Sequence, residues 1–192
     1  MNLPFKYLSK FPSATEQISK EFASIIFQGD FILLKGRLGA GKTKFVSGFV
    51  KNFCNNADNN IVTSPTFSLM NRYFCNESIV IDHFDFYRLK NLYDLENSGF
   101  FDSLNSDSIT IAEWGDKIDF DYKNIFKNYY FEVNIIVNED DSEVIDNKNT
   151  DNADINIDIP LNNNNTVNLQ DNLLENSFKN LYRQIIINKK YL

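Results

Sequence analysis

The sequence contains few of the residues that mark several large classes of protein. Its 192 residues include only two cysteines, Cys54 and Cys75, which lack the spacing of a metal site, and we expect both to be reduced thiols. No apolar run reaches the roughly 20 residues that cross a bilayer, and the N-terminus lacks the apolar region of a secretory signal. These absences argue against a zinc protein and a membrane protein, so we expect a cytoplasmic protein with no membrane partner.

An excess of basic residues, typical of proteins that bind nucleic acid directly, is also missing. The formal net charge is −7. Residues 138–176 contain ten acidic residues and one lysine, so this stretch accounts for the whole negative balance and the rest of the chain is nearly neutral. We therefore expect no basic patch large enough for direct DNA binding.

The remaining composition is that of a globular protein, with 43% hydrophobic and 15% aromatic residues. Residues 1–137 are long enough to bury a sizeable core and are predicted to form the main domain. Residues 138–176 are rich in Asn and Asp and cannot bury enough apolar surface to offset their ordering entropy, so we expect a disordered insertion. Apolar residues return in 177–192, which we expect to form a closing strand of the same domain. The alternative is a frayed tail that ends in an amphipathic element.

A complete G-x-x-x-x-G-K-[ST] motif is the most informative segment, and it runs from Gly36 to Thr43. An apolar run of strand length, 31–35, precedes it, and apolar residues on one helical face follow it over 45–53. A loop in this setting turns backbone N–H groups and the positive end of the helix dipole toward phosphates. Lys42 would reach the β- and γ-phosphates, and the Thr43 hydroxyl would bind Mg²⁺. We predict that the motif binds ATP or another nucleoside triphosphate through Gly36, Gly39, Ala40, Gly41, Lys42 and Thr43.

Other local patterns predict helices and strands that alternate along the chain. A capping box at Ser13–Glu16 predicts a helix start, and a short helix is predicted over 91–97, with Gly99 ending it. Strands are predicted over 31–35, 70–74, 78–81, 109–112 and 129–137, the last near the edge of the sheet. Together with the motif, this alternation predicts an α/β fold. We expect a P-loop NTPase-like three-layer sandwich, with a mostly parallel central sheet, helices on both faces and antiparallel strands at its close.

Two acidic residues are placed where predicted strands end. Glu113 directly follows the strand over 109–112, and Asp85 follows the segment 79–81 by one short turn. Ligands of α/β sheets bind at the carboxyl ends of the strands, and hydrolysis needs carboxylates near Mg²⁺ and the γ-phosphate. We therefore predict that Lys42, Asp85 and Glu113 are catalytic, although either acid alone could be a helix cap or a solvated residue.

Three further features have two interpretations each. The segment Ser64–Thr66 could reach the γ-phosphate with its hydroxyl groups, or it could be an ordinary X-Pro turn. His83 is the sole histidine, and the pattern favours a packed or capping imidazole over a proton carrier. Trp114 is interpreted as a core or rim aromatic residue. Spacing alone leaves these interpretations open.

The motifs, taken in order, resemble those of the TsaE family, the bacterial ATPases of tRNA threonylcarbamoyladenosine (t⁶A) biosynthesis. The resemblance covers residues 10–137, and 183–187 is similar to the last strand of the family. Two features depart from the family pattern: Gly115 stands where proline is usual, and the Asn/Asp-rich insertion is foreign to it. The resemblance depends on Gly36–Thr43, Ser64–Phe67 with Tyr73, His83–Leu89, Leu95–Phe100 and Glu113–Trp114.

This resemblance implies an ATP hydrolase that depends on Mg²⁺ and acts with the proteins TsaD and TsaB. It implies that tRNA is reached only through that complex, whose product forms at adenosine 37. It also implies that Thr43 and Glu113 hold Mg²⁺, that Lys44 lies next to the phosphate-binding residues, and that Thr15 lies near the nucleotide. Because no arginine finger is evident near the loop, we expect slow hydrolysis by the chain alone and stimulation by the partner complex.

Two other classes of nucleotide-binding protein share a phosphate-binding loop of this kind. A small-molecule or nucleoside kinase should have a lid with clustered arginines, but only Arg72 and Arg88 occur between Lys44 and Asn138. A guanine-nucleotide switch should have an N-K-x-D signature, but the similar segment 147–150 ends in threonine. The kinase is therefore the main alternative to the ATPase.

Overall fold

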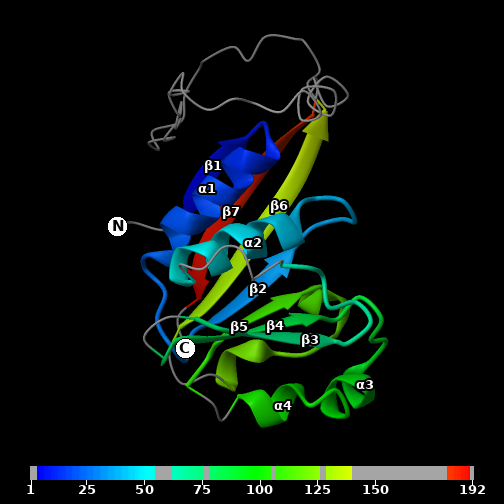
Figure 1. The fold of residues 1–192 in the computed structure, drawn as a ribbon. Helices are drawn as coiled ribbons and strands as arrows, with labels where there is room; N and C mark the ends of the chain where they lie inside the picture. The colour runs from blue at the N-terminus through cyan, green and yellow to red at the C-terminus, as the bar shows by residue number, and fades with distance from the viewer. Residues whose placement is uncertain are drawn as a thin grey trace.

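The computed structural model describes residues 4–54, 62–75, 78–104, 107–125, 129–139 and 181–190. Within these ranges the chain forms one sheet of seven strands in the order β1-β7-β6-β2-β5-β4-β3 (Figure 1). The elements are β1 (Phe5–Ser9), α1 (Pro12–Ala23), β2 (Phe31–Lys35), α2 (Lys42–Phe53), β3 (Met70–Phe74), β4 (Val80–Asp85), α3 (Leu92–Glu96), α4 (Phe100–Ser103), β5 (Ile109–Glu113), the 3₁₀ turns η2 (Gly115–Lys117) and η3 (Tyr122–Asn124), β6 (Tyr130–Glu139) and β7 (Leu181–Lys190).

Four parallel strands form the centre of the sheet. β6, β2, β5 and β4 pair in parallel, whereas β7 and β1 add antiparallel strands beyond β6, and β3 adds one beyond β4. The α/β class predicted from the sequence is therefore confirmed. The prediction that 129–137 lies near the sheet edge is wrong, because β7 and the N-terminal strand β1 both lie outside β6. No pattern in the sequence had indicated β1.

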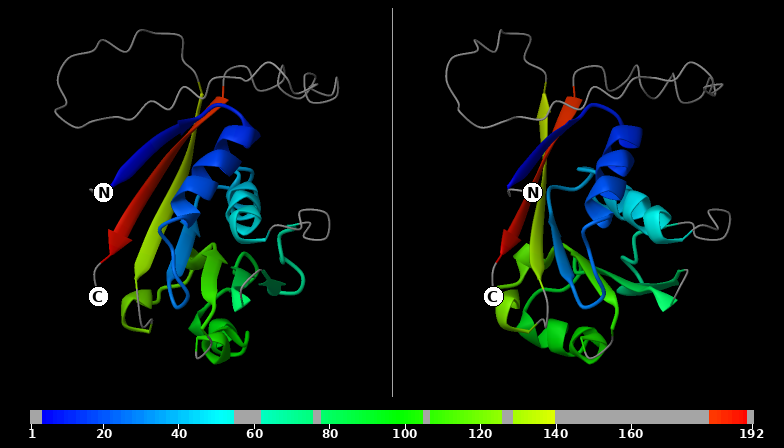
Figure 2. Two further views of the ribbon diagram at one scale, coloured as in Figure 1. Left: turned by 60° about the vertical axis from the view of Figure 1, so that its left-hand side comes forward. Right: turned by 90° about the vertical axis from the view of Figure 1, so that its left-hand side faces the viewer.

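The sheet separates two apolar cores. Alternate residues of the central strand β2 enter opposite cores: Ile32 and Leu34 enter one, and Phe31 and Leu33 enter the other. Helices α1 and α2 pack together over the first core (Figure 2), while α3, α4 and the segment after β5 cover the second. The helical residues that fill these cores are Ile18, Phe22, Phe45, Val46, Phe49 and Val50 on one face, and Leu95 and Phe100 on the other.

Several predicted element boundaries are wrong. Helix α1 begins at Pro12, with Phe11 as its cap and no side-chain cap hydrogen bond, so the predicted capping box is absent. Proline is favoured at the first helical position, because an N–H group there has no partner within the helix and proline lacks that group. Strand β4 continues through Asp85, which is therefore the last strand residue and does not follow a turn. Helix α3 ends at its C-cap Asn97, and Gly99, in the left-handed region, precedes α4.

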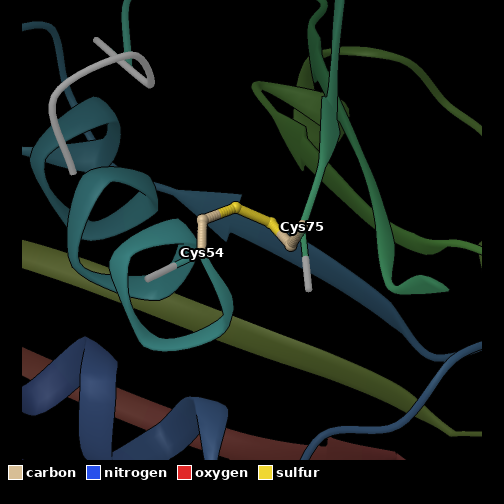
Figure 3. Close-up of a disulfide and its surroundings, with 2 residues drawn as sticks. All are labelled: Cys54 and Cys75. Atoms are coloured by element: carbon tan, nitrogen blue, oxygen red, sulfur yellow. A yellow bond between two sulfur atoms is a disulfide. The ribbon is translucent and has the colours of Figure 1, made fainter. Parts of the chain in front are cut away.

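Cys54 and Cys75 form a disulfide, which contradicts the prediction of two reduced thiols (Figure 3). Cys54 is the C-cap of α2, and Cys75 directly follows β3, so the bond joins the end of the helix to the strand. Their Cα atoms lie 4.5 Å apart although 21 positions separate them in sequence. The spacing of the two cysteines could not predict this, because the distance is set by how α2 and β3 meet in space.

The closing strand expected after the Asn/Asp-rich stretch is β7, which pairs antiparallel with β6 from Glu139 opposite Leu181. The predicted insertion, 138–176, starts two residues too early, because β6 continues through Glu139, and its remaining residues lie outside the described ranges. In the described ranges, no helix is long and apolar enough to cross a bilayer.

Candidate functional site

The G-x-x-x-x-G-K-[ST] motif, Gly36–Thr43, forms the loop between the central strand β2 and helix α2. Three of its glycines have positive φ angles: Gly36 at 149°, Gly39 at 78° and Gly41 at 103°. These angles are accessible to glycine without the strain that a Cβ would bring. At Gly36 space is also limiting, because a Cβ there would lie 2.6 Å from the carbonyl oxygen of Ile135 on β6. The loop conformation therefore depends on glycine for both reasons.

Lys42, the first residue of α2, is buried at the mouth of this loop. Its Nζ donates hydrogen bonds to the carbonyl oxygens of Gly36, at 2.8 Å, and Arg37, at 3.1 Å. The same Nζ lies 3.6 Å from the centre of the Trp114 ring. Cation–π attraction of this kind favours an ammonium group over an aromatic face. Trp114 is thus more than a rim residue, since it contacts the lysine of the motif.

Acidic groups surround Lys42. Burial lowers the pKa of its ammonium group, and the nearby carboxylates of Glu113, Asp85 and Asp116 oppose that shift. The structure therefore brings together the lysine and both acids that the sequence singled out, and it adds Asp116 on the turn η2. Nothing in the spacing of Asp116 had distinguished it from the other exposed acids.

Thr43 and Glu113 are in direct contact. The Thr43 hydroxyl donates to Oε1 of Glu113 at 3.1 Å, and Nε2 of His83 lies 3.0 Å from the same oxygen. An ionised carboxylate only accepts hydrogen bonds, so donation to Glu113 requires the tautomer of His83 that carries a proton on Nε2. His83 is fully buried and Glu113 is 2% exposed. His83 is packed, as the sequence favoured, but it also orients an acid of the site, which sequence reasoning missed.

Asp85 holds the segment that contains Ser64 and Thr66. Its Oδ2 accepts hydrogen bonds from the hydroxyls of Ser64 and, at 2.6 Å, Thr66, while its Oδ1 accepts one from the backbone N–H of Tyr87 at 3.0 Å. The Ser64–Thr66 segment is therefore tied to the acid at the end of β4. Since Asp85 pairs in register with Glu113 on β5, the segment lies beside the contact between Thr43 and Glu113.

The oxygen donors of the site fit a hard divalent cation. Mg²⁺ prefers oxygen ligands and usually completes its shell with water and substrate phosphates, so one or two protein ligands suffice. The hydroxyl of Thr43 and the carboxylate of Glu113 make such a pair. The described residues contain no cluster of three or more His, Cys, Asp or Glu side chains able to hold a metal by themselves. A Mg²⁺ ion here would therefore bind together with phosphate.

The side chains of Thr15 and Lys44 have partners away from the loop. Thr15 is buried, and its hydroxyl lies 2.7 Å from that of Ser9. Lys44 Nζ lies 2.9 Å from Oε1 of Glu16 on α1, and Lys51 Nζ lies 3.0 Å from the same atom. The side chain of Lys44 thus links α2 to α1.

One residue beside the loop comes from a distant part of the sequence. Nε of Arg183, on β7, donates to the carbonyl oxygen of Ala40 at 2.9 Å, across 143 positions. The acidic insertion separates Arg183 from every other site residue in sequence. The contact between Arg183 and Ala40 arises because β7 pairs with β6 in the folded protein, and sequence spacing does not predict it.

Comparison with known proteins agrees with the motifs. A sequence profile of the family described as "Threonylcarbamoyl adenosine biosynthesis protein TsaE" matches residues 9–145. A TsaE protein of Rickettsia felis is 35% identical over 144 residues, which cover 69% of this chain and 80% of that protein. A TsaE protein of Bacillus subtilis is 32% identical over 109 residues, which cover 56% of this chain and 65% of that protein.

A solved structure is also similar in fold. The crystal structure of YdiB from Bacillus subtilis matches with a TM-score of 0.57 at 20% sequence identity, and the match covers 97% of this chain and 86% of that one. The profile match extends over more than half of the chain and includes the loop, both acids and His83. The chain belongs to the TsaE family.

Proposed function

We propose that this chain is a Mg²⁺-dependent ATPase that acts in the t⁶A modification of tRNA together with TsaD and TsaB. The observation that carries the proposal is the 3.1 Å contact between Thr43 Oγ1 and Glu113 Oε1, at the point where the phosphate-binding loop enters α2. Both oxygens suit Mg²⁺ bound to a nucleotide. The tRNA role is supported by the relatives, which are named tRNA threonylcarbamoyladenosine biosynthesis proteins.

In the proposed reaction, water attacks the γ-phosphorus of ATP in line, the bond to the bridging oxygen breaks, and ADP and phosphate leave. The loop N–H groups and Lys42 would bind the phosphates and stabilise the charge that spreads over them. Thr43 and Glu113 would hold Mg²⁺, which would further neutralise that charge. Asp85 would act near the γ-phosphate, because it holds the hydroxyls of Ser64 and Thr66 beside Glu113.

The arginines of the β3–β4 region support the expectation of slow hydrolysis without a partner. Arg72 forms two hydrogen bonds with the buried carboxylate of Asp82, at 2.6 and 3.0 Å. Arg88 lies 4.1 Å from the ring centre of Phe67. Each guanidinium therefore has a partner within this chain, and we expect neither to stabilise the charge on the phosphates. We propose that docking of TsaD and TsaB completes the site and accelerates turnover.

Phosphate release at saturating ATP and Mg²⁺, with and without TsaD and TsaB, tests this proposal. We expect a low rate for the chain alone, a higher rate with the partners, and no release from Lys42→Ala in either case. Formation of t⁶A should be lost in a strain depleted of this protein and restored by the wild type but not by Lys42→Ala. Equal rates with and without the partners would reject the stimulation, and failure to bind ATP would reject the ATPase.

A further inference from the structure

A cation on the last strand reaches the phosphate-binding loop from outside the motif. Arg183 is the third residue of β7, and its Cα pairs with those of Ser9 on β1 and Val137 on β6. The hairpin of β6 and β7 continues past the end of β2, whose last residue, Lys35, pairs with Asn134 of β6. The hairpin therefore runs beside the loop that follows β2, and Arg183 lies on that part of it.

The guanidinium contacts the loop where it enters α2. Nε of Arg183 donates to the carbonyl oxygen of Ala40 at 2.9 Å. A Cβ added to the next residue, Gly41, would lie 3.5 Å from the same Nε, so Arg183 also covers that glycine. Because a peptide unit is planar, a hydrogen bond to the carbonyl of Ala40 also sets the direction of the N–H group of Gly41, and such N–H groups can bind phosphate. Arg183 thus fixes the orientation of the Ala40–Gly41 backbone.

The charge of Arg183 has no carboxylate partner within ion-pair distance in the described ranges of the chain. The side chain is half-buried, and burial lowers the pKa of its guanidinium. Arg72 makes a useful comparison, because the adjacent Asp82 raises the pKa of its guanidinium. A half-buried cation beside an anion-binding loop is stabilised when an anion binds there.

We propose that Arg183 is a positioning residue of the nucleotide site, which holds the Ala40–Gly41 backbone and adds positive charge to the field that binds the phosphate chain. This inference rests on the proposed function, because the charge has a role only if the loop binds a nucleotide. A purely structural tie between β7 and the loop is the competing explanation. The two differ in whether nucleotide affinity depends on the charge of residue 183.

Three variants separate charge from hydrogen bonding. Arg183→Gln keeps a side-chain N–H donor without the charge, Arg183→Lys keeps the charge, and Arg183→Ala removes both. ADP binding is measured by calorimetry at low and at physiological salt, together with the melting temperature of each variant without nucleotide. ADP is used because it occupies the loop without being hydrolysed.

We expect Arg183→Gln and Arg183→Ala to weaken ADP binding by about tenfold or more at low salt, as loss of a charge-assisted interaction does. Their affinity should also depend less on salt than that of the wild type, because one charge no longer contributes. Arg183→Lys should retain most of the affinity and the salt dependence. The inference would be overturned if Arg183→Gln bound ADP with the affinity and salt dependence of the wild type. It would also be overturned if Arg183→Gln melted at a lower temperature while the salt dependence of its ADP binding stayed unchanged.

A control variant on the same strand tests whether a change in net charge alone alters ADP binding. Lys189, at the other end of β7, lies over the ring of Tyr129, with Nζ 3.1 Å from its centre. Lys189→Gln changes the net charge as Arg183→Gln does, but far from the loop, and we expect unchanged ADP binding. If the wild type itself does not bind ADP or ATP, the proposed function fails. If the wild type binds and Arg183→Gln binds equally well, only the inference about Arg183 fails.

Discussion

Asp85 and Glu113 occupy paired positions at the ends of the parallel strands β4 and β5, yet their carboxylates have separate hydrogen-bond partners. Glu113 contacts Thr43 of the phosphate-binding loop and His83, whereas Asp85 holds the hydroxyls of Ser64 and Thr66. Adjacent acids with different partners are expected to have different roles. This separation allows each acid to be tested by a variant that leaves the other set of contacts intact.

Glu113→Gln should impair the use of Mg²⁺ more than the binding of nucleotide. The amide retains an oxygen for Thr43 but lacks the negative charge that a divalent cation requires. We expect ADP affinity without Mg²⁺ to stay within about twofold of the wild type, and the Mg²⁺ concentration for half-maximal ATP hydrolysis to rise about tenfold or more. Calorimetry and phosphate release measure the two quantities. An unchanged Mg²⁺ requirement would remove Glu113 from the metal site.

Asp85→Asn should lower the rate of hydrolysis while the Mg²⁺ requirement stays near that of the wild type. The amide oxygen can still accept hydrogen bonds, but the nitrogen that replaces the second oxygen cannot, so the hydrogen bonds of Ser64, Thr66 and the Tyr87 N–H group cannot all be kept. We expect a fall in kcat of about tenfold or more, with little change in ADP affinity. Steady-state kinetics over a range of Mg²⁺ concentrations check this, and a shifted Mg²⁺ requirement with unchanged kcat would contradict it.

Lys42→Met should abolish nucleotide binding without destabilising the protein that has no nucleotide bound. Burial lowers the pKa of Lys42, although nearby carboxylates oppose the shift, so the charged form is less favoured in the folded protein than in the unfolded chain. Methionine has a similar length and removes that cost, which we expect to offset the loss of the hydrogen bonds to the carbonyl oxygens of Gly36 and Arg37. Thermal unfolding without ligand should therefore give a melting temperature equal to or above that of the wild type.

Lys51→Met is the control for this prediction, because it removes an ion pair to Glu16 and should not raise the melting temperature. A lower melting temperature for Lys42→Met would contradict the assigned burial cost.

The sequence predicted the parts of the site that one continuous segment contains. The loop from Gly36 to Thr43, the strand before it and the apolar face of α2 were all recognisable, because their spacing has a direct geometric meaning. Glu113 was recognisable because it ends a strand, and Asp85 was found although the end of its strand was misplaced. Local pattern was sufficient in each of these cases.

Contacts between distant segments could not be predicted in this way. Arg183 lies beyond the acidic insertion, and its approach to Ala40 depends on the register of the last two strands. His83 resembles any buried histidine until the pairing of β4 with β5 brings it to Glu113. The strand β1 is only five residues long, and it pairs with the edge of β7, which offers it hydrogen-bond partners. In each case the deciding information is spatial.

Glu16 should stabilise the protein in a pH-dependent way. Burial raises the pKa of its carboxyl group, but hydrogen bonds from Lys44, Lys51 and Ser47 outweigh this, so the pKa lies below the ordinary value of 4.5. Because the folded state binds its proton less tightly than the unfolded state, the stabilisation is present above pH 4.5 and is lost as the pH falls through the lowered pKa.

Glu16→Gln tests this dependence. We expect the variant to be less stable than the wild type by about 1 kcal/mol at pH 7, with the difference shrinking as the pH falls through the lowered pKa of Glu16. Urea unfolding at several pH values measures it. Glu21→Gln is a control on the same helix, since Glu21 accepts a hydrogen bond from Gln17 in an exposed position, and we expect a smaller effect. A difference for Glu16→Gln that does not vary with pH would show that charge is not the cause.

The disulfide between Cys54 and Cys75 should stabilise the fold without affecting the nucleotide site. It closes a segment of 21 positions, for which the loss of entropy in the unfolded chain corresponds to about 3 kcal/mol. Cys54 lies at the C-terminal end of α2, and a helix of 12 residues separates it by about 18 Å from the loop at the other end.

Cys54→Ser, Cys75→Ser and the double variant should therefore unfold at a similar urea concentration, lower than that of the wild type, because each of them removes the same disulfide. Wild-type protein treated with dithiothreitol should approach that value, and all forms should bind ADP equally. Two thiols that react with iodoacetamide in unreduced, denatured protein would show that the bond is absent, and weaker ADP binding in Cys75→Ser would show that the link between α2 and β3 extends its effect to the loop.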